Sequence, residues 1–143
     1  MVVRLAEAEW KGDLKSGKGS VKAGQGLQCA YSFTSRFESG AGSNPEELLG
    51  AAHASCFSMA LSNALAGAGF TPTRVHTTAK VHLEKTDSGF AVTKIELETE
   101  ADVPNIDDAK FQAEAEKSKK GCPISKALSA VPISLNAKLT QKA

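Results

Sequence analysis

Two cysteines are the residues of this chain best suited to do chemistry. Cys56 lies in an alanine-rich run without charges, and Cys122 lies between a glycine and a proline, 66 residues further on. A thiol attacks as its thiolate, and a free cysteine with a pKa of about 8.5 stays mostly protonated near neutral pH. The neighbours of the two cysteines therefore decide between a redox thiol pair and two cysteines that only fill the core.

The residues around the two thiols support different interpretations of which thiol is reactive. His53 lies three positions before Cys56 on the same face of a helix, where a Cys–His pair could form, although a buried histidine is commonly a hydrogen-bonded core residue. Cys122 lies at the expected start of a short helix, directly after Lys119, Lys120 and a glycine, and such a position lowers a thiol pKa. From the residues alone Cys122 is the more acidic thiol, and a core-filling role for both cysteines stays open.

Composition and charge indicate one compact domain without a charged partner. The chain has 143 residues, of which 41% are hydrophobic and 23% charged, so residues 1–143 are expected to form a single domain with a modest core. Seventeen Lys and Arg against 16 Asp and Glu give a net charge of +1, which provides no strong field to attract nucleic acid or an anionic membrane. The expected partner is a small molecule or another protein.

The cysteine count and the N-terminus predict a reducing, cytoplasmic location. Three cysteines without any short spacing indicate neither a secreted disulfide framework nor a zinc site. Glu7 lies where a signal peptide would need an unbroken apolar stretch. His76 and His82 share one face of a predicted strand, but two histidines are too weak a pattern to indicate a metal, and no cofactor is indicated.

Hydrophobic patterns predict an α+β fold. Alternation of apolar and polar residues predicts strands at residues 2–10, 27–34, 75–84, 91–103 and 132–140. The start of the chain is expected to be rich in hairpins, and the third and fourth strands to form a hairpin around residues 87–89. Cys29 lies on the apolar face of the second strand and is expected in the core. Shorter helices are expected at residues 107–120 and from Cys122 onwards.

A long helix without charges is the central predicted element. Asn44 is a good N-cap, and Glu47 can reach back to the Asn44 N–H as in a capping box. Residues 48–73 contain no Asp, Glu, Lys or Arg, and Gly67 and Gly69 mark the helix end. A membrane span is the competing interpretation, but small and polar residues dilute the run and basic anchors are missing at its start. We expect the helix to be buried on most sides, and because one small domain cannot cover it, we expect a homodimer.

Several stretches together resemble a known family. They are Arg36-Phe37-Glu38, Asn44-Pro45-Glu46-Glu47-Leu48, Gly50-Ala51-Ala52-His53-Ala54-Ser55-Cys56-Phe57-Ser58-Met59-Ala60, Gly69-Phe70-Thr71-Pro72 and Lys120-Gly121-Cys122-Pro123. The chain closely resembles the OsmC branch of the OsmC/Ohr family from about Trp10 to Leu139. The resemblance implies an α+β fold with antiparallel sheets around two long central helices of an intertwined homodimer. It also implies thiol-dependent reduction of organic hydroperoxides and hydrogen peroxide.

The resemblance also implies a role for four residues. Cys56 matches the peroxidatic cysteine and Cys122 the resolving cysteine, which reverses the order of acidity suggested by the helix start. Arg36 matches an active-site arginine, whose permanent charge and several donors suit both a thiolate and a peroxide oxygen. Glu46 matches the carboxylate that orients this arginine. Phe57, Met59 and Leu61 would favour alkyl hydroperoxides, or they are plain core packing.

The implied cycle runs through a Cys56 sulfenic acid and a disulfide between Cys56 and Cys122. A dithiol reductant, such as a lipoyl-bearing protein, would reopen the disulfide. Glu46 and Cys56 are ten residues apart, roughly 15 Å along a straight helix, so we expect Arg36 and Glu46 of one subunit to serve Cys56 of the other. A helix break after Leu49 is the alternative that would allow assembly within one chain.

Two other functions remain open at this point. A thiol hydrolase or acyl-transfer enzyme would use Cys56 with His53 and would not require Cys122. A noncatalytic dimeric binding protein would bury Cys56 as an inert core residue.

Overall fold

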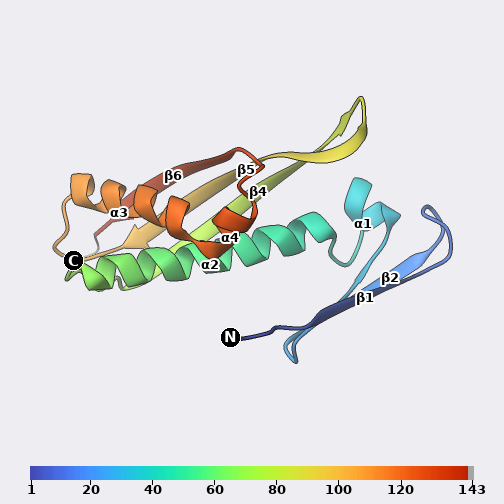
Figure 1. Cartoon of the computed structure of the whole chain (residues 1–143), viewed down its shortest axis with the longest axis horizontal. Helices are drawn as coiled ribbons and strands as arrows, with labels where there is room; N and C mark the ends of the chain where they lie inside the picture. Colours follow the sequence, from blue (N-terminus) through green and yellow to red (C-terminus); the bar gives the residue numbers. More distant parts are fainter. Residues whose placement is uncertain (142–143) are drawn as a thin grey trace. The chain divides into compact units, whose positions relative to one another are not determined.

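The computed structural model describes residues 1–141 of the chain, which divide into two compact units (Figure 1). The first unit comprises Met1–Leu48, and the second begins at Leu49. Each unit has a three-stranded sheet of its own, and helices occur in both units. The α+β class predicted from the hydrophobic patterns is therefore confirmed.

The first unit contains an antiparallel sheet in the order β1-β2-β3. Its strands are β1 (Ala6–Lys11), β2 (Lys18–Ala23) and β3 (Leu27–Tyr31). The hairpin-rich start is confirmed, but the predicted first strand begins too early. Ala6 pairs with Ala23, the last residue of β2, and beyond this pair the Leu5 carbonyl accepts the N–H of Gly24 at 3.4 Å, so the strand begins at Ala6. Cys29 is half-buried rather than part of the core.

A short helix that the alternation pattern hides follows β3. The strand predicted over residues 27–34 ends at Tyr31, and α1 (Phe33–Phe37) begins two residues later. Ser32 caps α1, because its Oγ accepts the N–H of Ser35 at 3.0 Å while the Ser35 Oγ accepts the N–H of Ser32 at 2.8 Å. This reciprocal pair of serine bonds satisfies free N–H groups at the helix start and redirects the chain.

The long helix α2 (Pro45–Gly67) begins and ends where predicted. The Asn44 Oδ1 accepts the N–H of Glu47 at 2.8 Å. The Glu47 side chain does not close the expected capping box; its Oε1 accepts a hydrogen bond from the Asn44 Nδ2 at 2.9 Å. At the other end Gly69 adopts a φ of 95°, and the Phe70 N–H reaches the Leu65 carbonyl at 2.9 Å. No break follows Leu49, because α2 is continuous.

The second unit contains a sheet in the order β4-β5-β6. Its strands are β4 (Arg74–Thr86), β5 (Gly89–Asp102) and β6 (Ile133–Thr140). β4 and β5 form the predicted antiparallel hairpin, whereas β5 and β6 are parallel, so the expectation of purely antiparallel sheets is corrected. A parallel pair needs a long crossover, and α3 (Asp108–Gly121) and α4 (Pro123–Ala127) provide it.

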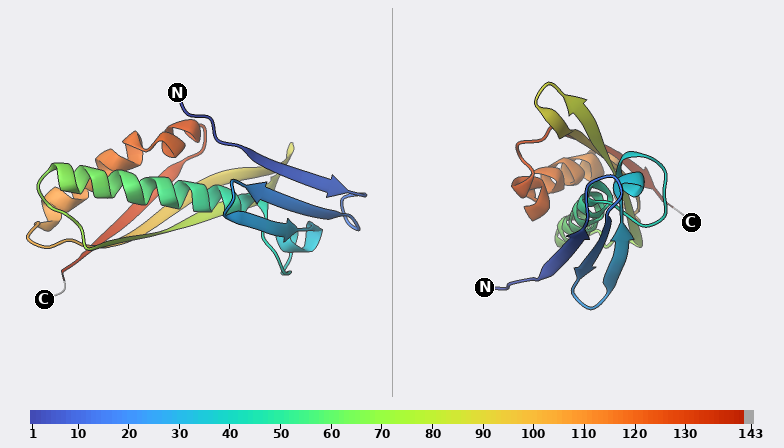
Figure 2. Two further views of the ribbon diagram at one scale, coloured as in Figure 1. Left: turned by 90° about the horizontal axis from the view of Figure 1, so that it is seen from below. Right: turned by 90° about the vertical axis from the view of Figure 1, so that its right-hand side faces the viewer.

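The core of the second unit lies between this sheet and its helices (Figures 1 and 2). Alternate residues of β5 point inward, and α2 and α3 pack against them. The fully buried large side chains of this core are those of Phe57, Leu61, Leu65, Ile95, Leu97, Val103 and Phe111. Phe57 and Leu61 are therefore core residues rather than a substrate surface. Alternate residues of β5 are apolar and face one side of the sheet, and apolar residues four positions apart share one face of α2. These two apolar faces pack against each other.

Only one face of α2 is buried within the chain. Gly50, His53, Phe57, Leu61 and Leu65 are buried at spacings of three or four, while the opposite face, which includes Met59, is exposed and carries no charge. The expectation that α2 is buried on most sides therefore does not hold within one chain. By length and composition α2 could cross a membrane, with 28% of its most apolar window buried. A core helix of a water-soluble protein has the same composition.

Candidate functional site

The second unit brings the two predicted cysteines together. Cys56 lies in the middle of α2, and Cys122 lies at the junction where α3 ends and α4 begins. Their sulfurs are 2.8 Å apart, joined by an S–H···S hydrogen bond, and both thiols are free. A disulfide has sulfurs about 2.05 Å apart, so closing this pair requires little movement. Cys122 precedes Pro123, the first residue of α4, and its backbone N–H donates to the Ser118 carbonyl at 2.9 Å.

Accessibility distinguishes the two thiols. Cys122 is 0% exposed and is part of the core, whereas Cys56 is half-buried and packs at the core's edge. Within the chain, a small molecule could reach Cys56 before it reached Cys122. Geometry therefore favours Cys56 as the thiol that meets a substrate.

Acidity distinguishes them in the opposite sense. Burial raises the pKa of Cys56, and the hydrogen bond with Cys122 raises it further. Burial is also the largest influence on the pKa of Cys122 and acts upward, but hydrogen bonds from Cys56 and from the backbone and hydroxyl of Ser125 together outweigh it, so the net direction is down. The order agrees with the sequence argument that placed Cys122 at a helix start. Cys56 therefore needs a cation from elsewhere to become a good nucleophile.

His53 is buried beside the thiols but does not bond Cys56. Its Nε2 lies 2.7 Å from the Ser125 Oγ, and its Nδ1 has no hydrogen-bond partner. Burial lowers the pKa of His53, which keeps the ring neutral. The arrangement gives no support to a Cys56–His53 hydrolase. Ser125 was not singled out in the sequence; the available signal was its position three residues after Cys122, at the start of α4.

The first unit brings together the other two predicted residues. The Arg36 Nη2 donates to the Glu46 Oε1 at 2.7 Å, and the Arg36 Nε donates to Oε1 at 3.1 Å and to Oε2 at 3.2 Å. Glu46 has only 11% of its side chain exposed, whereas Arg36 has 34%. The two-point contact fixes the plane of the guanidinium. Its remaining donors can still bind an anion or an oxygen.

An apolar hollow of about 220 Å³ adjoins Arg36 in the first unit. Aromatic side chains dominate its lining: Trp10, Tyr31, Phe33 and Phe37, together with Leu14, Ser32 and Arg36. The Arg36 Cζ lies 5.2 Å from the centre of the Phe37 ring, within the range of a cation–π contact. Such a hollow could hold the organic part of a ligand whose polar end faces the guanidinium.

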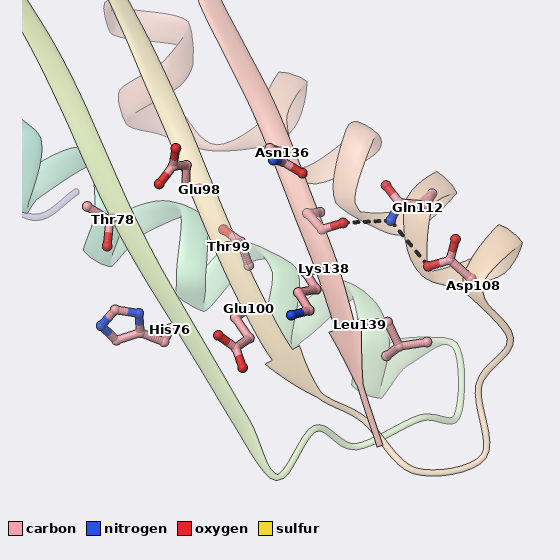
Figure 3. A pocket seen from close by; sticks show the side chains of 11 residues that line it. His76, Thr78, Glu98, Thr99, Glu100, Asp108, Gln112, Asn136, Lys138 and Leu139 are labelled. Carbon is pink, nitrogen blue, oxygen red and sulfur yellow. Dashed lines mark hydrogen bonds between the residues drawn. The ribbon is translucent and has the colours of Figure 1, made fainter. Parts of the chain in front are cut away.

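A second hollow, of about 700 Å³, lies on the polar face of the β4-β5-β6 sheet (Figure 3). His76 and Glu100 lie on paired strands there, and the Gln112 Nε2 donates to the Ala137 carbonyl at 2.7 Å. Neither cysteine of the pair lines it. Within residues 1–141, no group of three or more His, Cys, Asp and Glu side chains could hold a metal ion. The His82 Nε2 is hydrogen-bonded to the Glu96 Oε2 at 3.0 Å.

Comparisons with known proteins place the chain in a family. The sequence model of the family described as OsmC-like protein matches residues 38–136. The chain is 55% identical over 129 residues to Peroxiredoxin OsmC of Escherichia coli strain K12, covering 89% of this chain and 90% of that protein. Peroxiredoxin OsmC of Shigella flexneri matches with the same values. The two thiols, the α+β fold and these matches agree: the chain belongs to the OsmC family.

Solved structures share the fold. The organic hydroperoxide resistance protein OsmC from Legionella pneumophila superposes with a TM-score of 0.72 at 23% identity, covering 96% of this chain and 99% of that one. The organic hydroperoxide resistance protein OhrB of Bacillus subtilis gives a TM-score of 0.68 at 23% identity, covering 95% and 98%. At this identity the structures show the fold alone.

Proposed function

We propose that this chain is a cysteine-based peroxidase that reduces organic hydroperoxides, and also hydrogen peroxide. The observation that carries the proposal is the pair of free sulfurs, Cys56 on α2 and Cys122 at the junction of α3 and α4, 2.8 Å apart. Membership of a family whose curated relatives are named Peroxiredoxin OsmC supports the reaction class. A reductant is then needed to restore the thiols after each turnover.

In the proposed first step the Cys56 thiolate attacks the terminal oxygen of the hydroperoxide. The S–O bond forms as the O–O bond breaks, and the alkoxide takes up a proton to leave as an alcohol, so Cys56 becomes a sulfenic acid. Arg36 stabilises both the thiolate and the charge on the departing oxygen, which offsets the burial that raises the Cys56 pKa. Glu46 holds the guanidinium plane through its two-point contact.

In the second step the Cys122 thiolate attacks the sulfur of the Cys56 sulfenic acid. The S–S bond forms, the S–O bond breaks, and the hydroxyl group leaves as water after taking up a proton. A dithiol then reduces the disulfide by thiol exchange and is itself oxidised; a lipoyl-bearing protein is a reductant of this class. The greater exposure of Cys56 and the full burial of Cys122 support this order of roles.

The organic part of the substrate would bind in the aromatic hollow beside Arg36. Trp10 and Phe37 provide apolar walls, and the guanidinium would hold the peroxide end. Replacing the apolar part of the substrate with a hydrogen atom, as in hydrogen peroxide, removes this binding contribution. The proposal therefore includes a preference for organic hydroperoxides.

We further propose a cytoplasmic homodimer whose active sites are shared. The exposed, uncharged face of α2 and the half-exposed apolar residue Leu27 in the first sheet support a second subunit as cover. Because α2 is continuous, Glu46 and Cys56 are separated by about 15 Å along one helix. An antiparallel partner helix would supply its own Arg36 and Glu46 to the middle of α2.

The test is the intact mass of the reduced protein after one equivalent of an organic hydroperoxide. A disulfide lowers the mass by about 2 Da as two hydrogens leave. We expect this loss in the unmodified chain and in Cys29→Ser, no change in Cys56→Ser, and a gain of oxygen in Cys122→Ser. An unchanged mass in the unmodified chain would rule out the peroxidase, and loss of the first oxidation in Cys122→Ser alone would exchange the two cysteine roles.

A further inference from the structure

A buried histidine next to the thiol pair has no part in the cycle described so far. His53 is 0% exposed and Ser125 only 5%, and the 2.7 Å bond between them links α2 to α4 across the core. Burying a histidine and a hydroxyl in an apolar core is costly unless they are hydrogen-bonded, and the bond between them leaves the Nδ1 of His53 unpaired. Ser125 also lies three residues after Cys122 in the chain, at the start of α4.

The unpaired Nδ1 determines which way the hydrogen bond runs. A neutral imidazole carries one N–H, and a buried N–H without a partner is rarer than an acceptor without one. We therefore assign the hydrogen to Nε2, which donates to the Ser125 Oγ, and leave the unpaired Nδ1 as an acceptor. With its lone pair engaged by His53, the Ser125 hydroxyl has its own hydrogen free to donate.

We assign the sulfur of Cys122 as the acceptor for that hydrogen, because a side-chain hydrogen bond from Ser125 lowers the pKa of Cys122. The hydroxyl and the backbone of Ser125 both act as donors that lower the pKa of Cys122. A hydrogen bond to the thiolate favours the charged form, and the bond from His53 polarises and orients the donor. The groups that act on the pKa of Cys122 are the Cys56 thiol of α2 and, from α4, the backbone of Ile124 and the backbone and hydroxyl of Ser125.

We infer that His53 and Ser125 are positioning residues for Cys122: two hydrogen bonds in series, from imidazole to hydroxyl to sulfur, favour its thiolate form beside Cys56 and set the rate of disulfide closure. The part of the inference that concerns the rate of disulfide closure rests on the proposed function. The effect of the two hydrogen bonds on the pKa of Cys122 is present in the reduced protein without any peroxide. No atom is exchanged through the pair; its donors stay bonded while Cys122 attacks and water leaves.

The first experiment titrates Cys122 without peroxide. In a chain carrying Cys29→Ser and Cys56→Ser, the ultraviolet absorbance of the remaining thiolate is followed against pH. We expect Ser125→Ala to move the apparent pKa upward by about one unit, and Ser125→Thr, which keeps a hydroxyl, to restore it. The matched control is Ser118→Ala, because the Ser118 hydroxyl is also buried but donates to the Glu114 carbonyl. No shift in Ser125→Ala would overturn the inference.

The second experiment times disulfide closure after one equivalent of hydroperoxide, with a sulfenic-acid trap and mass spectrometry. Below the thiol pKa, a rise of one unit lowers the thiolate fraction about tenfold, so Ser125→Ala should close about tenfold more slowly while the first oxidation keeps its rate. The deficit should shrink as the pH rises. A slowing by the same factor at every pH would indicate disturbed packing and would overturn the inference.

Two variants of His53 test the hydrogen bond between His53 and Ser125. His53→Gln places an amide N–H near the position of Nε2 and should retain most of the closure rate, whereas His53→Leu removes the donor and should resemble Ser125→Ala. Equal behaviour of the two variants would exclude His53 from the pair. If the unmodified chain consumed no hydroperoxide, the proposed function would fail on that result, and the titration of Cys122 would decide the present inference independently.

Discussion

At the scale of single residues, the charge that activates Cys56 is the main requirement. Burial raises its pKa, and its neighbour Cys122 contributes in the same direction. In the proposed mechanism the compensating cation is the Arg36 guanidinium, which Glu46 fixes in orientation while other donors of the guanidinium stay available. If so, the residues that hold this charge matter as much as the thiol itself.

The first prediction concerns this cation. Arg36→Met keeps much of the aliphatic stem but removes the charge and the planar fork, so the rate of peroxide reduction at neutral pH should fall about a hundredfold. Arg36→Lys should recover little, because an ammonium cannot make the two-point contact with Glu46. Stopped-flow measurement of the first oxidation of Cys56 checks this, and an unaltered rate in Arg36→Met would remove the arginine from the mechanism.

The family resemblance, rather than the residue patterns, singled out Cys56, Cys122, Arg36 and Glu46 as site residues. The structure pairs the two cysteines with each other and Arg36 with Glu46. Ser125 could not be found in this way, because its importance depends on a contact with a histidine 72 positions away. A serine after a proline otherwise indicates only a helix start.

At the scale of elements, one side chain ties the start of α2 to α1. The Asn44 Oδ1 caps α2 by accepting the Glu47 N–H, while its Nδ2 donates to the Ser35 carbonyl at 2.8 Å and also to Glu47. The segment that carries Arg36 is therefore connected to the helix that carries Glu46. The pair is held by this cap as well as by its own bonds.

Asn44→Ala should accordingly destabilise the protein by about 1–2 kcal/mol, because it removes a cap and leaves the Ser35 carbonyl without its donor. Asn44→Asp keeps the capping oxygen but not the amide, so its stability should lie between those of the unmodified chain and Asn44→Ala. Urea unfolding followed by circular dichroism measures both. A loss of stability in Asn44→Asp equal to that in Asn44→Ala would show that the cap itself contributes nothing.

Elements with a strong local signal were predicted well, and α1 was not. The alternation of apolar and polar residues predicts the hairpin of β4 and β5. Asn44 and Gly69 predict the start and the end of α2. The alternation of β3 happens to continue into residues 33 and 34, and the serine pair that starts α1 is recognisable only once the chain is seen to turn. Here the capping bonds outweigh the strand pattern.

At the scale of the whole molecule, the half-covered α2 predicts a shared active site. Mixing Cys56→Ser subunits with Arg36→Met subunits should give heterodimers in which one site has both an intact Cys56 and an intact Arg36, contributed by different chains. Peroxide consumption should therefore reappear in the mixture, at about half the activity of the unmodified dimer per heterodimer. Verified heterodimers without activity would refute the shared site.

Patterns in one chain cannot fully predict such an assembly. The absence of charge in residues 48–73 indicated that α2 needs more cover than one chain provides, and only the structure showed that one face is covered from within. The parallel pairing of β6 was missed for a similar reason. Strand direction depends on the crossover through α3 and α4, not on the strand's own residues.

That parallel pairing also sets the order in which a newly made chain can become competent. β5 ends at Asp102 and β6 begins at Ile133, and Cys122 lies in the crossover between them. Pairing across so long a connection is slow, because the loop must be ordered before its contacts form. Cys56 also precedes Cys122 by 66 residues, so it leaves the ribosome first during synthesis, and a Cys56 sulfenic acid formed before Cys122 is in place could not close the proposed disulfide.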